Sequence, residues 1–102
     1  AVRALAAATG AVVLLKGPRT LVCGADGQIA INPTGGPALA TAGSGDVLTG
    51  VIAALIAAGH PPIIAASLGA YVHGAAGDAL AARLGNGTIA SDLPEAIAAA
   101  LA

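Results

Sequence analysis

The stretch from Val47 to Gly77 contains no Asp, Glu, Lys or Arg, and this apolar run restricts the possible folds more than any other feature. It is either a helical hairpin in lipid or a pair of helices that cover a sheet. His60-Pro61-Pro62 divides the run, and the piece before the division is shorter than the roughly 20 apolar residues that a membrane span needs. Much of the run is alanine, a helix former with little area to bury. The pattern therefore favours two buried helices on a sheet.

Both halves of the run have helical spacing. In the first half Gly59 is a plausible helix end, and the predicted buried face consists of Leu48, Val51, Ile52, Leu55 and Ile56. The second helix is predicted over about 63–83, with Pro61 or Pro62 in its first turn, and its predicted apolar set is Ile64, Leu68, Tyr71, Val72 and Leu80. Glycines inside this helix lower its propensity, and we expect them where the helix approaches a neighbour closely: Gly69, Gly74 and Gly77.

The part before the run predicts a helix end and three short strands. Residues 1–10 are typical of the last turns of a helix closed by Gly10, and strands follow at 11–15, 20–23 and 28–32. The first strand is predicted to be buried on both faces. Asp26-Gly27 predicts a hairpin between the other two, with Ile29 and Ile31 opposite a wetter face at the sheet edge.

A last helix is predicted to start at Ser91 or Asp92, with Pro94-Glu95 in its first turn. The order of elements is then helix end, strand, hairpin, loop and helices. It predicts the closing part of an α/β layered domain, with residues 1–102 as a single partial domain.

Composition excludes several classes of partner. Four basic residues nearly balance five acidic ones and Tyr71 is the one aromatic residue, which argues against nucleic acid and anionic lipid as partners. The lone cysteine, Cys23, lies in an apolar strand, so no disulfide framework is expected, and this fits a reducing cytoplasm.

Two segments are suited to phosphate chemistry. Gly43-Ser44-Gly45 opens directly into the first apolar helix, where backbone N–H groups and the helix dipole attract an anion. Asp46 at this position is either an N-cap or a group that takes part in proton transfer. The second segment is Lys16-Gly17-Pro18-Arg19-Thr20, a turn with two cations after a strand.

Two further polar residues are interpreted as structural. His73 lies on an apolar helix and is expected to be a hydrogen-bonded core histidine. Asp78 is interpreted as an exposed helix residue or a partner of Arg83. Neither residue is assigned to the site, and no metal ligand is assigned.

Three ordered motifs together resemble the ADP-dependent NAD(P)H-hydrate dehydratase family, which has the ribokinase-like fold. They are Thr34 to Gly50, Lys16-Gly17 upstream and Tyr71 to Asp78 downstream. Family members are much longer, so the chain resembles their C-terminal portion. Three positions depart from the commonest family residues Asn, Met and Gly, namely Gly36, Leu39 and Ala42.

The resemblance implies a cytoplasmic hydro-lyase, forming homo-oligomers, that repairs hydrated NADH or NADPH. ADP or ATP, assisted by Mg²⁺, phosphorylates the hydroxyl of the hydrated ring, and loss of phosphate restores the coenzyme. Asp46 is then the general base and meets the substrate. The nucleotide contacts are implied for Lys16, Gly17, Pro18, Arg19, Thr20, Gly43, Ser44 and Gly45.

Two other functions stay open at this point. One is a ribokinase-like small-molecule kinase of the hydroxymethylpyrimidine or thiazole type, which shares the Gly-Ser-Gly-Asp loop in variant form. The other is a segment that has no activity on its own and serves only as part of a larger body.

Overall fold

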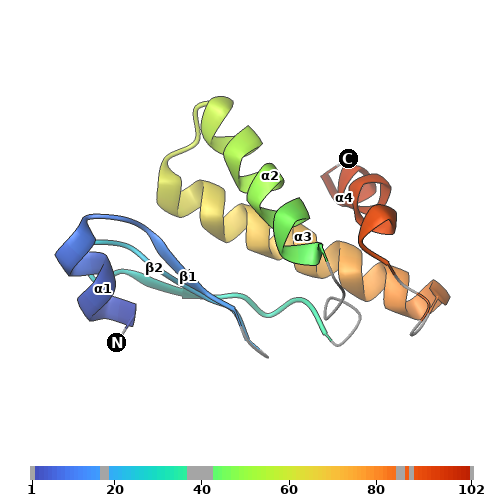
Figure 1. The fold of residues 1–102 in the computed structure, drawn as a ribbon, viewed down its shortest axis with the longest axis horizontal. Coiled ribbons are helices and arrows are strands. Elements are labelled where there is room, and N and C mark those ends of the chain that lie inside the picture. Colours follow the sequence, from blue (N-terminus) through green and yellow to red (C-terminus); the bar gives the residue numbers. More distant parts are fainter. Residues whose placement is uncertain (1, 17–18, 37–42, 85–86, 88, 102) are drawn as a thin grey trace.

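The computed structural model describes residues 2–16, 19–36, 43–84, 87 and 89–101. Its elements are α1 (Val2–Thr9), β1 (Val13–Leu15), β2 (Leu21–Cys23), β3 (Ile29–Ile31), α2 (Ser44–Ala57), α3 (Pro62–Leu84), the 3-10 turn η3 (Ala90–Asp92) and α4 (Leu93–Leu101). Figure 1 shows α3 running along the molecule, with the sheet on one side and α2 and α4 on the other. The predicted α/β class and order of elements are confirmed.

The three strands form an antiparallel sheet in the order β1-β2-β3. The predicted hairpin is present between β2 and β3. Gly27 lies in the left-handed region at φ +86°, which favours glycine, and the Asp26 carboxylate accepts a hydrogen bond from the Gln28 N–H at 3.0 Å. Local turn chemistry therefore sets the register of this pair.

The two faces of the sheet differ from the prediction at its edges. Val22 and Cys23 on β2 are fully buried on opposite faces, since α3 and α1 both pack on this strand. Leu15 and Ile31 pair with Leu21 from either side and are 50% and 60% exposed. The expected burial of β1 on both faces and of the isoleucine face of β3 is therefore wrong, because α1 packs on β1 and β2 and α3 packs on β2, and this packing leaves Leu15 and Ile31 about half exposed.

The buried face of α3 consists mostly of small residues. Ile64 and Tyr71, which the helical periodicity placed on the buried face, are about half exposed, whereas Val72 and Leu80 are buried as predicted. The other buried positions are Ala65, Ala66, Gly69, Ala70, His73, Gly74, Ala76 and Gly77. Because α3 has neighbours on several sides, close packing selects small side chains over large apolar ones.

Two glycines of α3 lie at close approaches, as predicted. A Cβ on Gly69 would stand 2.7 Å from the Ile52 Cγ1 of α2. A Cβ on Gly74 would overlap the Thr34 side chain and lie 2.7 Å from the Thr34 carbonyl carbon. The segment after β3 and the middle of α2 can therefore both lie against α3.

The helix ends follow the expected signals. Pro62 is the first residue of α3, and Gly59, just after α2, has φ +103°. Asp92 directly precedes α4 at the predicted position, but its carboxylate accepts a hydrogen bond at 2.9 Å from the preceding Ile89 N–H and so closes the 3-10 turn η3.

The main core lies between α3 and α4. Its buried residues are Val72, Ala76, Leu80, Leu93 and Ile97, and Val47 and Val51 of α2 pack against them. By length and composition α3 is the one helix among the described residues able to cross a membrane, but 56% of its most apolar window is buried inside the fold. Such burial is typical of the central helix of a protein core.

The close approach at Gly74 gives a stability prediction. Gly74→Ala is expected to lower the free energy of unfolding by roughly 1–3 kcal/mol, because the methyl group overlaps Thr34. Gly50→Ala is the matched control, since a Cβ there meets nothing within 4 Å and alanine raises helix propensity. Denaturant unfolding of the protein that carries this sequence, called the natural chain below, measures the free energy of unfolding of each variant. Equal stability of the two variants would contradict the packing described.

Candidate functional site

The start of α2 has the geometry of an anion site. The helix begins at Ser44, and its N-cap is Gly43, with φ +85° in the left-handed region that favours glycine. Glycine has no side chain with which to cap the first-turn N–H groups. These donors and the positive end of the helix dipole are therefore available to an anionic group.

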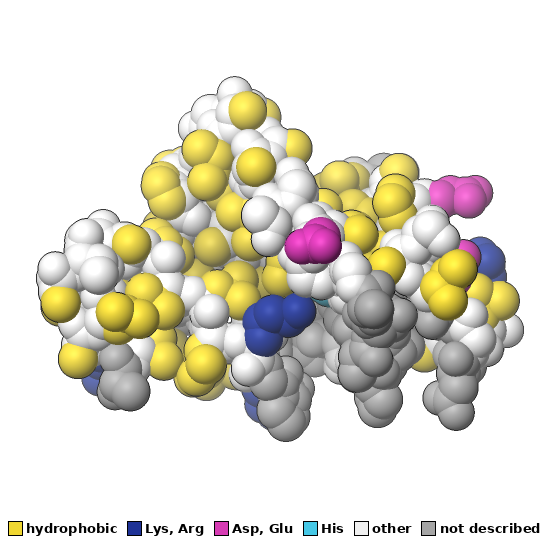
Figure 2. Space-filling model, viewed as in Figure 1, with side chains coloured by type: hydrophobic (Ala, Val, Ile, Leu, Met, Phe, Trp, Pro, Cys, Tyr) yellow, Lys and Arg dark blue, Asp and Glu magenta, His cyan; other side chains and the backbone are white. Residues whose placement is uncertain are grey.

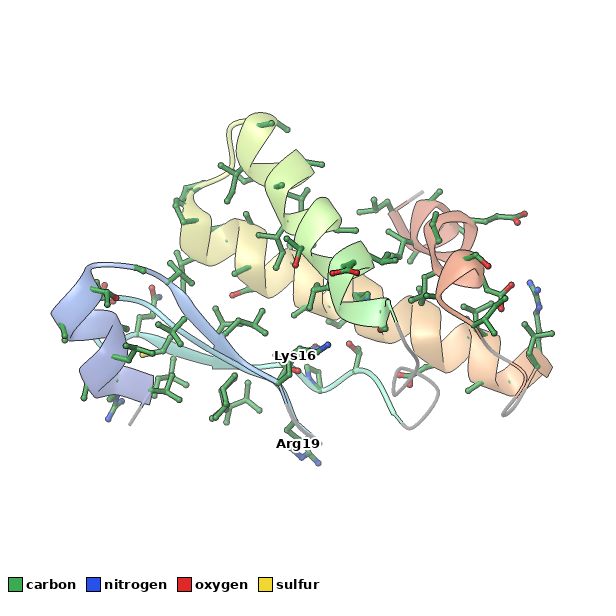
Figure 3. The ribbon with its side chains drawn as sticks, in the orientation of Figure 1. Lys16 and Arg19 are labelled. Atoms are coloured by element: carbon green, nitrogen blue, oxygen red, sulfur yellow. The ribbon has the colours of Figure 1, made fainter. Side chains whose placement is uncertain are left out.

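Lys16 brings a positive charge to this helix start. It directly follows β1, and its Nζ lies 3.4 Å from the position that a Cβ on Gly45 would take. Figure 3 shows the Lys16 side chain directed toward the start of α2. Gly45 does not have a positive φ, so what glycine provides here is open space beside the ammonium group rather than a special backbone conformation. A side chain would fill that space.

Asp46 is the third residue of α2, and its side chain is exposed. The N-cap alternative for this residue is excluded, because Gly43 holds that position. Figure 2 shows acidic and basic side chains near each other on the face between the sheet and α2. An exposed carboxylate at this position is open to a substrate proton.

His73 contacts this helix start, although the sequence analysis interpreted it only as a hydrogen-bonded core histidine. It is 3% exposed, and its Nε2 lies 3.0 Å from the Ser44 carbonyl oxygen and 3.2 Å from the Ser44 Oγ. Burial lowers the pKa of His73, as does the positive charge of Lys16, while the hydrogen bond to the Ser44 backbone raises it. The balance favours the neutral imidazole. The one sequence signal for this role was its place in the Tyr71 to Asp78 motif.

The segment after β3 is tied to the same part of α3. Asn32 donates from its side-chain amide to the Ala70 carbonyl oxygen at 2.9 Å, and the Thr34 hydroxyl donates to the Tyr71 carbonyl oxygen at 2.9 Å. The Asp78 carboxylate accepts from the Gly35 N–H at 3.0 Å, a partner that the sequence did not indicate. Residues 70–78 therefore hold both the loop after β3 and the start of α2.

The remaining predicted site residues are less closely grouped. Arg19 is exposed, and Figure 3 shows its side chain pointing away from the helices. Thr20 is half-buried, and its carbonyl oxygen accepts a hydrogen bond from the Asn32 N–H at 2.8 Å. Gly17 and Pro18, and with them Leu39 and Ala42, lie outside the described residues. The structure thus brings together Lys16, Gly43, Ser44, Gly45 and Asp46.

No cluster of three His, Cys, Asp or Glu side chains able to hold a metal ion occurs among the described residues. Magnesium in phosphoryl-transfer sites is held mainly by the phosphates, by water and by one or two carboxylates. An ion that arrives with a nucleotide would therefore be held chiefly by the phosphates and by water.

The influence of Lys16 on His73 can be measured. Lys16→Met removes one of the causes that lower the pKa of His73, so the pKa is expected to rise. Arg19→Met is the matched control, because that cation points away from the site. NMR titration of the imidazole measures both variants, and an unchanged His73 pKa in Lys16→Met would overturn the proximity of the two groups.

The comparisons with known proteins all point to one family. The model of the family described as NAD(P)H-hydrate dehydratase matches residues 1–99. The ADP-dependent (S)-NAD(P)H-hydrate dehydratase of Neisseria meningitidis is 47% identical over 94% of this chain and 33% of its own length. The bifunctional NAD(P)H-hydrate repair enzyme of Moorella thermoacetica is 63% identical over 74% of this chain and 14% of its own length.

The solved structures agree. The ADP/ATP-dependent NAD(P)H-hydrate dehydratase from Bacillus subtilis, co-crystallised with ATP and Mg²⁺, superposes with a TM-score of 0.91 and 32% identity. The match covers 98% of this chain and 36% of that one. The fold is therefore that of these enzymes, and the chain spans about a third or less of the length of these relatives.

Proposed function

The chain belongs to the NAD(P)H-hydrate dehydratase family, and from this premise we propose that it supplies the general base and part of the nucleotide site of a dehydratase for hydrated NADH or NADPH. ADP or ATP is the proposed phosphoryl donor. The observation that carries the proposal is the convergence of Lys16 with the glycine-rich start of α2, directly before the exposed Asp46.

The residues divide the chemistry between them. Asp46 accepts the proton of the ring hydroxyl as that oxygen attacks the terminal phosphorus. The bond between this phosphorus and the bridging oxygen breaks, and the nucleotide leaves one phosphate shorter. Loss of inorganic phosphate and a proton from the ring then restores the double bond of NADH or NADPH.

Charge stabilisation comes from the backbone and from Lys16. The first-turn N–H groups of α2 point toward the charge that develops on the transferred phosphoryl group. The Lys16 ammonium stands beside Gly45, at the same helix start. A magnesium ion bound with the nucleotide, held chiefly by the phosphates and by water, would supply further positive charge. Gly17, Pro18, Arg19 and Thr20 complete the proposed nucleotide contacts.

The proposed partners are small molecules in the cytoplasm. Nearly balanced charge and the single aromatic residue support the absence of nucleic acid as a partner. The burial of α3 inside the fold supports the absence of a membrane. A homo-oligomer, which the family resemblance implies, stays a prediction.

Replacement of the base tests the function. In the natural chain that carries this sequence, Asp46→Asn is expected to lower kcat for hydrated NADH with ADP by about 10²–10⁴-fold, because the amide cannot accept the proton. Formation of NADH is followed by its absorbance. Glu95→Gln, at an exposed carboxylate in the first turn of α4, is the matched control and should keep full turnover.

Three results would contradict this proposal. One is full turnover by Asp46→Asn, and another is absence of turnover by the natural chain itself. The third is accumulation of a stable phosphorylated product, which indicates a small-molecule kinase instead.

A further inference from the structure

A buried histidine holds the start of α2 from across the molecule. His73 lies on α3, 29 residues from Ser44 in the sequence, and its Nε2 is 3.0 Å from the Ser44 carbonyl oxygen. A carbonyl oxygen only accepts hydrogen bonds, so Nε2 carries the proton and donates it. The carbonyl oxygen has a second lone pair, so it can accept a hydrogen bond within α2 as well.

The hydrogen bond acts where the helix has little other support. Ser44 is the first residue of α2 and is almost fully buried, while Gly43 before it offers no side chain to brace the turn. Gly45 and Asp46, which carry the proposed chemistry, follow directly. Holding the Ser44 carbonyl therefore sets the direction of the next N–H groups and of the Asp46 carboxylate.

The helix that carries His73 is itself held by the segment after β3. Asn32 and Thr34 donate to the carbonyl oxygens of Ala70 and Tyr71, and Gly74 allows Thr34 to lie against the helix. His73 therefore follows two residues of α3, Ala70 and Tyr71, whose carbonyl oxygens are held by hydrogen bonds from the segment after β3. A side chain on such a rigid element places its partner more accurately than one on a loop.

We propose that His73 is a positioning residue that orients the first turn of α2 through the hydrogen bond from its Nε2 to the Ser44 carbonyl. The kinetic part of this inference rests on the proposed function. The structural part does not, because the order of the helix start is measurable in the absence of substrate.

The kinetic test compares three variants of the natural chain with hydrated NADH and ADP. His73→Leu removes the donor and is expected to lower kcat by about 10–100-fold, the usual effect of losing an outer-shell partner. His73→Gln retains an N–H donor at a similar reach and should restore kcat to within about threefold. Leu80→Ala, in the buried core of α3, should lower the melting temperature while keeping kcat.

The second readout is amide hydrogen exchange along α2. His73→Leu is expected to speed the exchange of the Val47 and Leu48 amides by about tenfold or more, while amides 53–55 exchange as in the parent chain. His73→Gln should exchange as the parent does. This readout decides the inference even if the parent chain proves to have no dehydratase activity, an outcome that would overturn the proposed function alone.

The inference is overturned by any of three results. They are unchanged exchange of Val47 and Leu48 in His73→Leu, an equal loss of kcat in His73→Gln and His73→Leu, and a loss in Leu80→Ala that matches that of His73→Leu.

Discussion

The close packing around α3 is the constraint on which the rest of the structure depends. This helix contacts β2 on one side and α2 and α4 on others, so its buried face consists largely of alanine and glycine. A larger side chain at Gly74 would displace the segment after β3, and one at Gly69 would displace α2. These small residues let Thr34 and the middle of α2 lie against the same helix, and His73 of that helix contacts Ser44 at the start of α2.

Electrostatics at the helix start follow from this packing. The positive end of the α2 dipole and the Lys16 ammonium already stand together, and a buried imidazolium beside them would add a third positive charge. Burial and Lys16 both lower the pKa of His73, so the imidazole stays neutral and serves as a hydrogen-bond donor. The positive potential is thereby concentrated beside Gly45, where the proposed phosphate contact lies.

Features that depend on local chemistry could be predicted from the sequence. The Asp26-Gly27 hairpin, the end of α2 just before Gly59 and the glycine-rich start of α2 each depend on backbone conformations that few residues adopt. Burial was harder to predict, because it depends on neighbours that periodicity does not identify. Ile64 and Tyr71 fit the apolar periodicity of a helix, yet both are about half exposed, and the buried face of α3 consists mostly of small residues.

In the candidate site, too, the residues that are contiguous in the sequence could be predicted, whereas contacts between distant segments could not. Gly43, Ser44, Gly45 and Asp46 are contiguous, and their role was inferred from the motif. The approach of Lys16 to Gly45 joins a strand end to a distant helix start, and spacing alone did not predict it. His73 was interpreted as a core residue because a histidine on an apolar helix usually is one; its contact with Ser44 becomes visible only once α2 and α3 are packed.

The central claim is that the space beside Gly45 and Lys16 receives a phosphate group. Its most direct test is the affinity of the natural chain for ADP, measured by calorimetric titration, in Gly45→Ala and Gly50→Ala. Both changes add one methyl group to α2, but only the first places it 3.4 Å from the Lys16 ammonium. We expect Gly45→Ala to weaken ADP binding by about tenfold or more, or roughly 1.4 kcal/mol, and Gly50→Ala to leave it unchanged. Equal affinity in the two variants would contradict the claim.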